Sequence, residues 1–170
     1  MGHFLGTHQS RLDAKGRVSV PAPFRVALRN GGARDEAEAA MMILRPSHQH
    51  PCIEVWPAAA FHALAAPLAQ YDVFSDTQDD LATALYSDAR EMAADKEGRI
   101  VLPPALLEHA GITDAMEFMG IGRIFQIWRP EAAQQRRDQA RANAQTRRLT
   151  LPGSMGTIRP AGRTDAGEPA

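Results

Sequence analysis

Residues 12–24 read LDAKGRVSVPAPF, and residues 94–106 read ADKEGRIVLPPAL. When the two stretches are placed 82 residues apart, an Asp, a Gly, an Arg and a Pro fall in register, together with three apolar positions. Self-similarity at a fixed offset is the sequence signature of a repeat. The chain is therefore predicted to contain two copies of one folding unit.

The shared Asp-x-x-Gly-Arg segment, at 13–17 and at 95–99, is typical of a tight turn. Gly adopts the positive φ that other residues resist, and Asp can accept hydrogen bonds from its own downstream backbone. After the first turn, Val18–Val20 alternates in polarity and predicts a half-buried strand. After the second, the apolar run Ile100–Leu102 predicts a strand buried on both faces.

Each of these strands ends at a proline, which donates nothing to a β-ladder but is tolerated in the first turn of a helix. Short helices are predicted over 23–28 and 105–110, the second ended by Gly111. Downstream, Cys52–Pro57 matches Ile124–Pro130 at an offset of 72, so the first half carries about ten extra residues, expected in the loop at 30–40. The matching segments predict strands whose tryptophans belong to the core.

The rest of the chain connects or extends the two halves. Residues 58–69 predict a helix that Pro67 bends or ends, and a second helix is predicted from Asp79 through Arg90. The predicted division is a first repeat (1–57), connecting helices (58–91), a second repeat (92–130), a polar arginine-rich helix (131–148) and a disordered tail (149–170). For the arginine-rich helix, DNA contact, contact with a neighbouring subunit and simple solvation stay open.

Composition limits the class of protein. The chain has 170 residues, 44% of them hydrophobic and 23% charged, with a formal net charge of -1. No apolar stretch reaches the ~18–20 residues of a membrane span, and the N-terminus lacks the features of a signal peptide. One cysteine, Cys52, forms no internal disulfide, which favours a reducing compartment such as the cytoplasm. The charge argues against a simple polycationic binder of nucleic acid, although it can hide a local basic patch.

The two turns with their flanks, together with Gly120–Trp128, resemble the MraZ family of bacterial transcriptional regulators over roughly residues 1–148. The resemblance implies an α+β, mainly β fold of two tandem AbrB-like swapped-hairpin β-barrel halves, so that one chain forms a pseudo-dimer. It also implies a nucleoid-associated, ring-shaped homo-oligomer that binds repeated boxes of double-stranded DNA. The expected role is repression of its own division and cell-wall gene cluster.

The resemblance associates the Asp-x-x-x-Arg motif with DNA contact, which selects Asp13, Arg17, Asp95 and Arg99. A guanidinium can pair with guanine O6 and N7 or bind phosphate. The other interpretation is a structural Asp–Arg clamp across each turn, and the two roles are compatible. Further candidates for phosphate contact are Lys15, Lys96 and Arg11, against the alternative of ordinary solvated side chains.

Other chemistry is not expected. His48, His50 and Cys52 alternate as zinc ligands on a strand could, but Pro51 interrupts the alternation and no fourth ligand is evident, so no metal site is predicted. No catalytic set or phosphate-cradling glycine loop is present, so no enzyme, cofactor, small-molecule substrate or membrane partner is expected. The alternatives to the regulator are an AbrB-type antitoxin or nucleoid-associated protein, and a structural assembly module that binds no DNA.

Overall fold

The computed structural model describes residues 2–31 and 35–152, and the chain divides after Gln134 into two compact units. The first repeat contains β1 (Thr7–Arg11), β2 (Arg17–Ser19), α1 (Ala22–Arg29), α2 (Glu36–Ala40), β3 (Met41–Pro46) and β4 (Ile53–Pro57). The connection contains α3 (Ala58–His62), α4 (Ala65–Leu68) and α5 (Asp76–Tyr86). The second repeat contains β5 (Arg90–Ala93), β6 (Arg99–Val101), α6 (Pro104–Ala110), β7 (Ala115–Gly120) and β8 (Phe125–Trp128), and α7 (Pro130–Thr146) follows it.

The two halves exchange strands within one antiparallel sheet of order β1-β7-β8-β4-β3-β5. Strand β1 of the first half pairs with β7 of the second, and β5 of the second half pairs with β3 of the first. Strands β2 and β6, which are equivalent in the repeat, form a separate two-stranded ribbon. The predicted α+β class and the intrachain pseudo-dimer are confirmed, whereas closure of the sheet into a barrel stays a prediction.

A pseudo-twofold axis runs through the strand pairs. Val18 pairs with its equivalent Ile100, and Glu54 pairs with its equivalent Gln126. Equivalent strands begin 82 residues apart for β2 and β6, 74 for β3 and β7, and 72 for β4 and β8. Eight of the ten extra residues therefore lie between α1 and β3, where α2 forms, and two lie in the connection from β3 to β4.

The core is shared by the two halves. Phe24 on α1 contacts the ring of Phe125 on β8 at 4.8 Å between centroids, and Phe4 packs against both at 5.5 and 5.1 Å. These side chains are fully buried, together with Val18 of β2, Ile100 of β6 and Leu106 of α6. Burial of apolar surface from both repeats in one cluster makes the exchanged halves a single folding unit. Trp128 joins a buried cluster with Cys52, while Trp56 is half-buried.

Three local predictions need correction. Val101 is 57% exposed, so β6 buries one face only, like β2, in which the equivalent residue is Ser19. The helix predicted from Asp79 through Arg90 begins earlier, because the Ser75 side chain accepts the backbone N–H of Gln78, and it ends at Tyr86. Arg90 instead begins β5 and pairs with Leu44 of the first half.

The predictions for the two short helices hold, and Gly111 ends α6 in the left-handed conformation at φ 64°. The helix predicted over 58–69 is interrupted between α3 and α4. In the described ranges, no helix has the length and apolar character needed to cross a membrane. Most of the predicted disordered tail, from residue 153 on, lies outside the described residues.

Candidate nucleic-acid interface

The first Asp-x-x-Gly-Arg turn is closed by Asp13. Its Oδ1 accepts the backbone N–H groups of Lys15 and Arg17 at 2.9 and 2.8 Å, and its Oδ2 accepts Nε–H of Arg17 at 2.7 Å. Gly16, at φ 73°, donates its N–H to the Asp13 carbonyl. One carboxylate therefore shapes the turn and orients the arginine that leaves it.

The second turn repeats this geometry. Asp95 Oδ1 accepts the backbone N–H groups of Glu97 and Arg99 at 3.0 and 2.8 Å, and Oδ2 accepts Nε–H of Arg99 at 3.1 Å. The clamp is thus formed in both halves. The second turn differs in that Nη2 of Arg99 also donates to Glu97 Oε2 at 3.2 Å. Lys15 occupies the position of Glu97 in the first turn, so the first turn is the more positive of the two.

The hydrogen bonds of the clamps stabilise the charged form of both carboxylates. The pKa of Asp13 lies below its ordinary value, first because the backbone N–H of Arg17 donates to it and then because the guanidinium does, against the effect of partial burial. The pKa of Asp95 is lowered by the same groups of Arg99. Partial burial works to lower the pKa of Arg99, but its hydrogen bond to Asp95 and the nearby negative charges, including Asp13, raise it.

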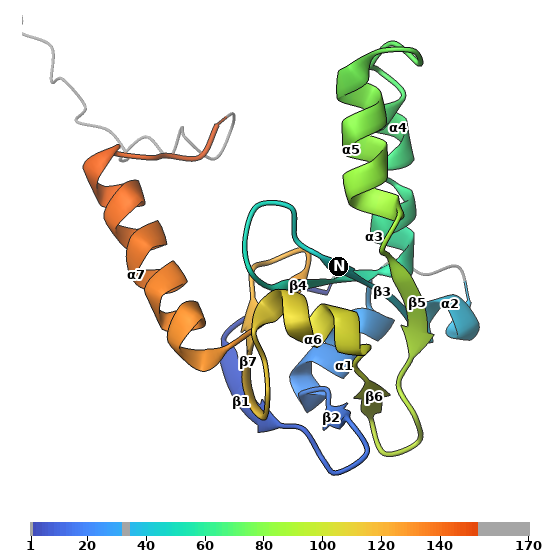
Figure 1. Cartoon of the computed structure of the whole chain (residues 1–170), viewed down its shortest axis with the longest axis vertical. Coiled ribbons are helices and arrows are strands. Elements are labelled where there is room, and N and C mark those ends of the chain that lie inside the picture. The colour runs from blue at the N-terminus through green and yellow to red at the C-terminus, as the bar shows by residue number, and fades with distance from the viewer. Residues whose placement is uncertain (1, 32–34, 153–170) are drawn as a thin grey trace, which may run out of the picture. The chain divides into compact units, whose positions relative to one another are not determined.

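The ribbon brings the two turns together. The backbone N–H of Val20 donates to the Gly98 carbonyl at 2.9 Å, and that of Leu102 donates to the Gly16 carbonyl at 3.2 Å. Figure 1 shows the loops that lead into β2 and β6 side by side at one end of the unit. The side chains of Arg17 and Arg99 are 27% and 29% exposed.

The remaining sequence candidates lie at the surface. Lys15 and Lys96 are exposed at the tips of the turns. Arg11 is at the end of β1, where its Nη1 forms an exposed ion pair at 2.7 Å with Asp114, in the loop before β7. Arg11 is therefore engaged within the chain, and an exposed pair of this kind contributes little to stability.

Arg25 on α1 is a residue that the sequence analysis missed. Its guanidinium lies over Gly98, where a Cβ would be 2.5 Å from Nη1, and its Nε is buried without a hydrogen-bond partner in the described part of the chain. The equivalent of Arg25 in α6 is Leu107, and a Cβ at Gly16 would have open space around it. Only tertiary packing reveals that α1 covers the second turn while the first turn stays uncovered.

This difference predicts unequal effects of the same substitution. Gly98→Ala and Gly16→Ala each place a side chain at a positive φ, at a cost of roughly 1–2 kcal/mol. Gly98→Ala is expected to lower the free energy of unfolding further, because its methyl group must displace Arg25. Urea denaturation of both variants measures the difference, and adding Arg25→Ala should reduce it. Equal destabilisation by the two substitutions would contradict the packing.

The histidine and cysteine side chains near 50 have separate partners. Nδ1 of His48 lies 3.1 Å from Nη2 of Arg45, the ring of His50 lies against Trp128 at 5.8 Å between centroids, and Cys52 is fully buried. Within the described ranges, no group of three His, Cys, Asp or Glu side chains is arranged to hold a metal ion.

Known proteins are similar to this chain in sequence. The chain matches a protein-family model described as "MraZ protein, putative antitoxin-like" over residues 3–83 and 85–152, which include both turns. It is 60% identical over 152 residues to the transcriptional regulator MraZ of Gluconacetobacter diazotrophicus, covering 89% of this chain and 93% of that protein. It is 56% identical over 146 residues to the MraZ of Gluconobacter oxydans, covering 86% and 87%. The MraZ of Azorhizobium caulinodans is 35% identical over 156 residues, covering 92% and 96%.

Proposed function

This chain belongs to the MraZ family and is a transcriptional regulator rather than an enzyme, and we propose that it regulates transcription by binding double-stranded DNA through its two Asp-clamped turns. The observation that carries the proposal is the pair of equivalent arginines, Arg17 and Arg99, each oriented by its own aspartate on one short ribbon. A transcriptional regulator of this kind would work in the cytoplasm, at the nucleoid.

The clamps support base contact by these arginines. In each turn the aspartate holds Nε, so the Nη groups extend from a guanidinium whose direction is already set. A pre-oriented guanidinium loses less conformational entropy when it binds, and its planar fork matches guanine O6 and N7 or a phosphate. Lys15 and Lys96, exposed beside the arginines, would contact phosphates and add affinity without sequence information.

The excess of acidic over basic residues lies away from the two turns. Residues 46–89 contain six acidic residues and no Lys or Arg, whereas residues 1–45 contain seven basic and four acidic residues. The acidic segment includes the α4–α5 hairpin, at the end of the first unit opposite the two turns in Figure 1. The near-zero net charge is therefore compatible with a locally basic first turn.

Assembly would compensate for the small number of cations on each chain. In a ring-shaped homo-oligomer several pairs of turns would meet repeated promoter boxes at once, and the high effective concentration would multiply weak contacts. Binding to the promoter of its own division and cell-wall gene cluster would then exclude RNA polymerase. This mechanism makes the protein a repressor.

Binding to one box and to several boxes tests this function. A DNA fragment with two or more boxes from upstream of the gene is expected to bind at least about tenfold more tightly than a fragment with one box, because the second contact is intramolecular. Gel-shift titration with non-specific competitor at a fixed salt concentration measures both affinities. A scrambled fragment of equal length is the control, and equal affinity for all three fragments would overturn the proposal.

The antitoxin alternative is kept because the matching family model is described as antitoxin-like. An antitoxin would bind a toxin protein tightly as well as DNA. Affinity purification of the tagged full chain from its own host distinguishes the two functions. Recovery of a toxin protein in an amount equal to that of the tagged chain supports the antitoxin. Recovery of the chain with DNA alone supports the regulator.

A further inference from the structure

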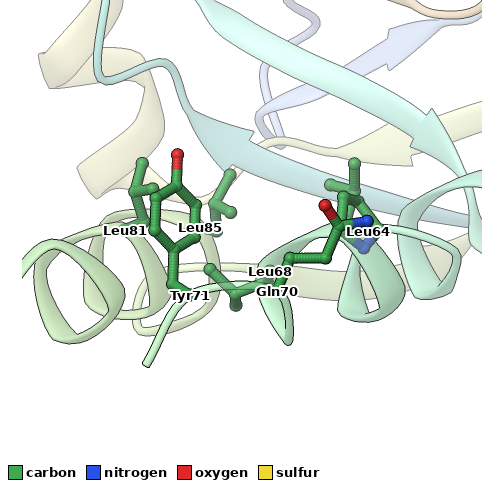
Figure 2. A pocket seen from close by; sticks show the side chains of 7 residues that line it. Leu64, Leu68, Gln70, Tyr71, Leu81 and Leu85 are labelled. Atoms are coloured by element: carbon green, nitrogen blue, oxygen red, sulfur yellow. The ribbon is translucent and has the colours of Figure 1, made fainter. Parts of the chain in front are cut away.

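The α4–α5 hairpin contains an apolar groove of about 530 Å³. Leu64, Leu68 and Tyr71 line it from one helix and its connection, and Leu81 and Leu85 line it from α5. Figure 2 shows Tyr71 beside Leu81 and Leu85 of α5, with Leu64 further along the groove. The groove belongs to the connecting segment and not to the two turns.

The first unit leaves this hairpin incompletely covered. Neither α4 nor α5 contains a buried residue, so the leucines of the groove are only half-buried. At the tip of the hairpin, Val73 is 70% exposed and Phe74 is 96% exposed. Large exposed apolar patches on soluble proteins mark interaction sites.

Acidic side chains surround the groove. The segment from Asp72 to Asp88 contains five aspartates and no Lys or Arg. Asp72 directly follows Tyr71, and Asp80 directly precedes Leu81, so both lie next to residues of the lining. An occupant of this groove therefore needs apolar anchors with positive charges beside them.

The end of α7 has this chemistry. Residues 147–151 read RRLTL, and Leu149 and Leu151 are 55% and 65% exposed. Arg148 ends the helical conformation with φ 48°, and the N–H of Leu149 donates to the Ala144 carbonyl at 3.0 Å. This left-handed cap fixes the point at which the two leucines leave the helix, directly after two arginines.

We propose that the segment Arg147–Leu151 of one copy docks in the α4–α5 groove of a second copy. Leu149 and Leu151 would fill the groove, and the two arginines would face the aspartates at its rim. The groove and its occupant are different surfaces of the same chain, and a contact of this head-to-tail kind closes into a ring when the rotation between subunits allows it. The inference rests on the part of the proposed function in which the chain forms a homo-oligomer, and it names the two surfaces that would join the copies.

Substitution of the anchors tests the contact. Leu149→Asp with Leu151→Asp is expected to raise the protein concentration at half-assembly at least tenfold. Thr150→Asp is the matched control, because alternate residues of an extended segment point to opposite sides. Light scattering of the full chain without DNA measures the assembly. A monomeric wild type, or equal effects of the double variant and the control, would overturn the inference.

A second pair of variants probes the rim of the groove without touching its apolar lining. On α5, Asp80 lies about 100° around the helix from Leu81 and about 140° from Leu85, whereas Asp76 lies about 140° from Leu81 and about 180° from Leu85, on the opposite face. Asp80→Arg is expected to weaken assembly at least threefold through repulsion of the arginine pair, and Asp76→Arg is expected to leave it within twofold. Equal effects of these two variants would overturn the proposed position of the arginines.

Disulfide trapping identifies the copy that supplies the segment. Chains carrying Tyr71→Cys are mixed with chains carrying Leu151→Cys, while Cys52 stays buried in both. A reducible dimer with one chain of each kind is the expected product. If instead a chain with both substitutions closes on itself and the mixture gives no such dimer, the second-copy assignment is wrong.

The outcomes separate this inference from the DNA-binding proposal. If the anchor variant, Leu149→Asp with Leu151→Asp, fails to assemble while Arg17→Ala binds DNA as tightly as the wild type, the role of the turns is rejected and the groove contact is supported. If instead Arg17→Ala loses DNA binding while the anchor variant assembles as the wild type does, the groove contact is rejected and the role of the turns is supported.

Discussion

Arg17→Ala is expected to weaken binding to a fragment with two promoter boxes by about 30-fold or more. A bidentate arginine–guanine contact contributes ~1–3 kcal/mol, and a fragment that engages two subunits loses two such contacts. The combined loss is therefore ~2–6 kcal/mol. Because a loss of about 1.4 kcal/mol corresponds to a tenfold loss of affinity, the lower limit of this range corresponds to a loss of about 30-fold. Gel-shift titration at fixed salt measures the loss, and light scattering checks that the assembly keeps its mass.

Arg99→Ala is the matched control and is expected to cost less affinity than Arg17→Ala. Its Nη2 already donates to Glu97 Oε2, so DNA must displace this carboxylate and meets its negative charge. In the first turn, Lys15 takes the place of Glu97. Glu97→Gln is therefore expected to tighten binding and to make Arg99→Ala more costly. Identical affinities for wild type and Arg17→Ala would exclude the first turn from the interface.

Arg45→Ala is expected to destabilise the folded chain by ~3–5 kcal/mol, since it leaves the carboxylate of Glu54 buried without its counter-ion. Arg45 is 2% exposed, and its guanidinium lies 3.0 Å from Glu54. Its Nη1 also donates to the carbonyl of Ala84 at 3.1 Å, which links β3 to α5. Urea denaturation at one fixed protein concentration measures the change, because assembly adds to the stability of the native state.

The second half of the chain provides the control for this experiment. At the positions equivalent to Arg45 and Glu54 it has Met119 and Gln126, paired in the same register. Gln126 accepts Nε1–H of Trp128 at 2.9 Å, as Glu54 accepts that of Trp56 at 3.0 Å. Arg45→Met with Glu54→Gln is therefore expected to recover more than half of the stability lost in Arg45→Ala. A double variant as unstable as Arg45→Ala would show that the ion pair itself, rather than the buried lone charge, decides the stability.

The turns could be predicted from the sequence because the hydrogen bonds that close each turn join residues within five positions of one another. Asp13 reaches the N–H groups of Lys15 and Arg17, and Gly16 permits the left-handed step between them. The repeat then identified the second turn without further information. The length of α5 could not be predicted as well, because Ser75 caps it at one end and pairing of Arg90 with a strand of the first half competes with the helix at the other.

Burial was less predictable than local geometry. An apolar run such as Ile100–Leu102 predicts two buried faces, but Val101 lies on the outer face of a two-stranded ribbon that no other layer covers in the described structure. The number of layers around a strand depends on the whole fold. Pattern alone therefore cannot decide which apolar side chains of an edge element reach the core.

By itself, the sequence determined the duplication, the two Asp-clamped turns and the types of most elements, since these depend on contacts between near neighbours and on a comparison of the chain with itself. Only the tertiary structure decided that β1 pairs with β7 and β5 with β3, and that Arg25 covers Gly98 but leaves Gly16 open. The reason is physical: partners separated by 46 to 112 residues are selected by burial of a common core. That selection adds a difference in packing to the difference in charge that Lys15 and Glu97 already make between the two turns.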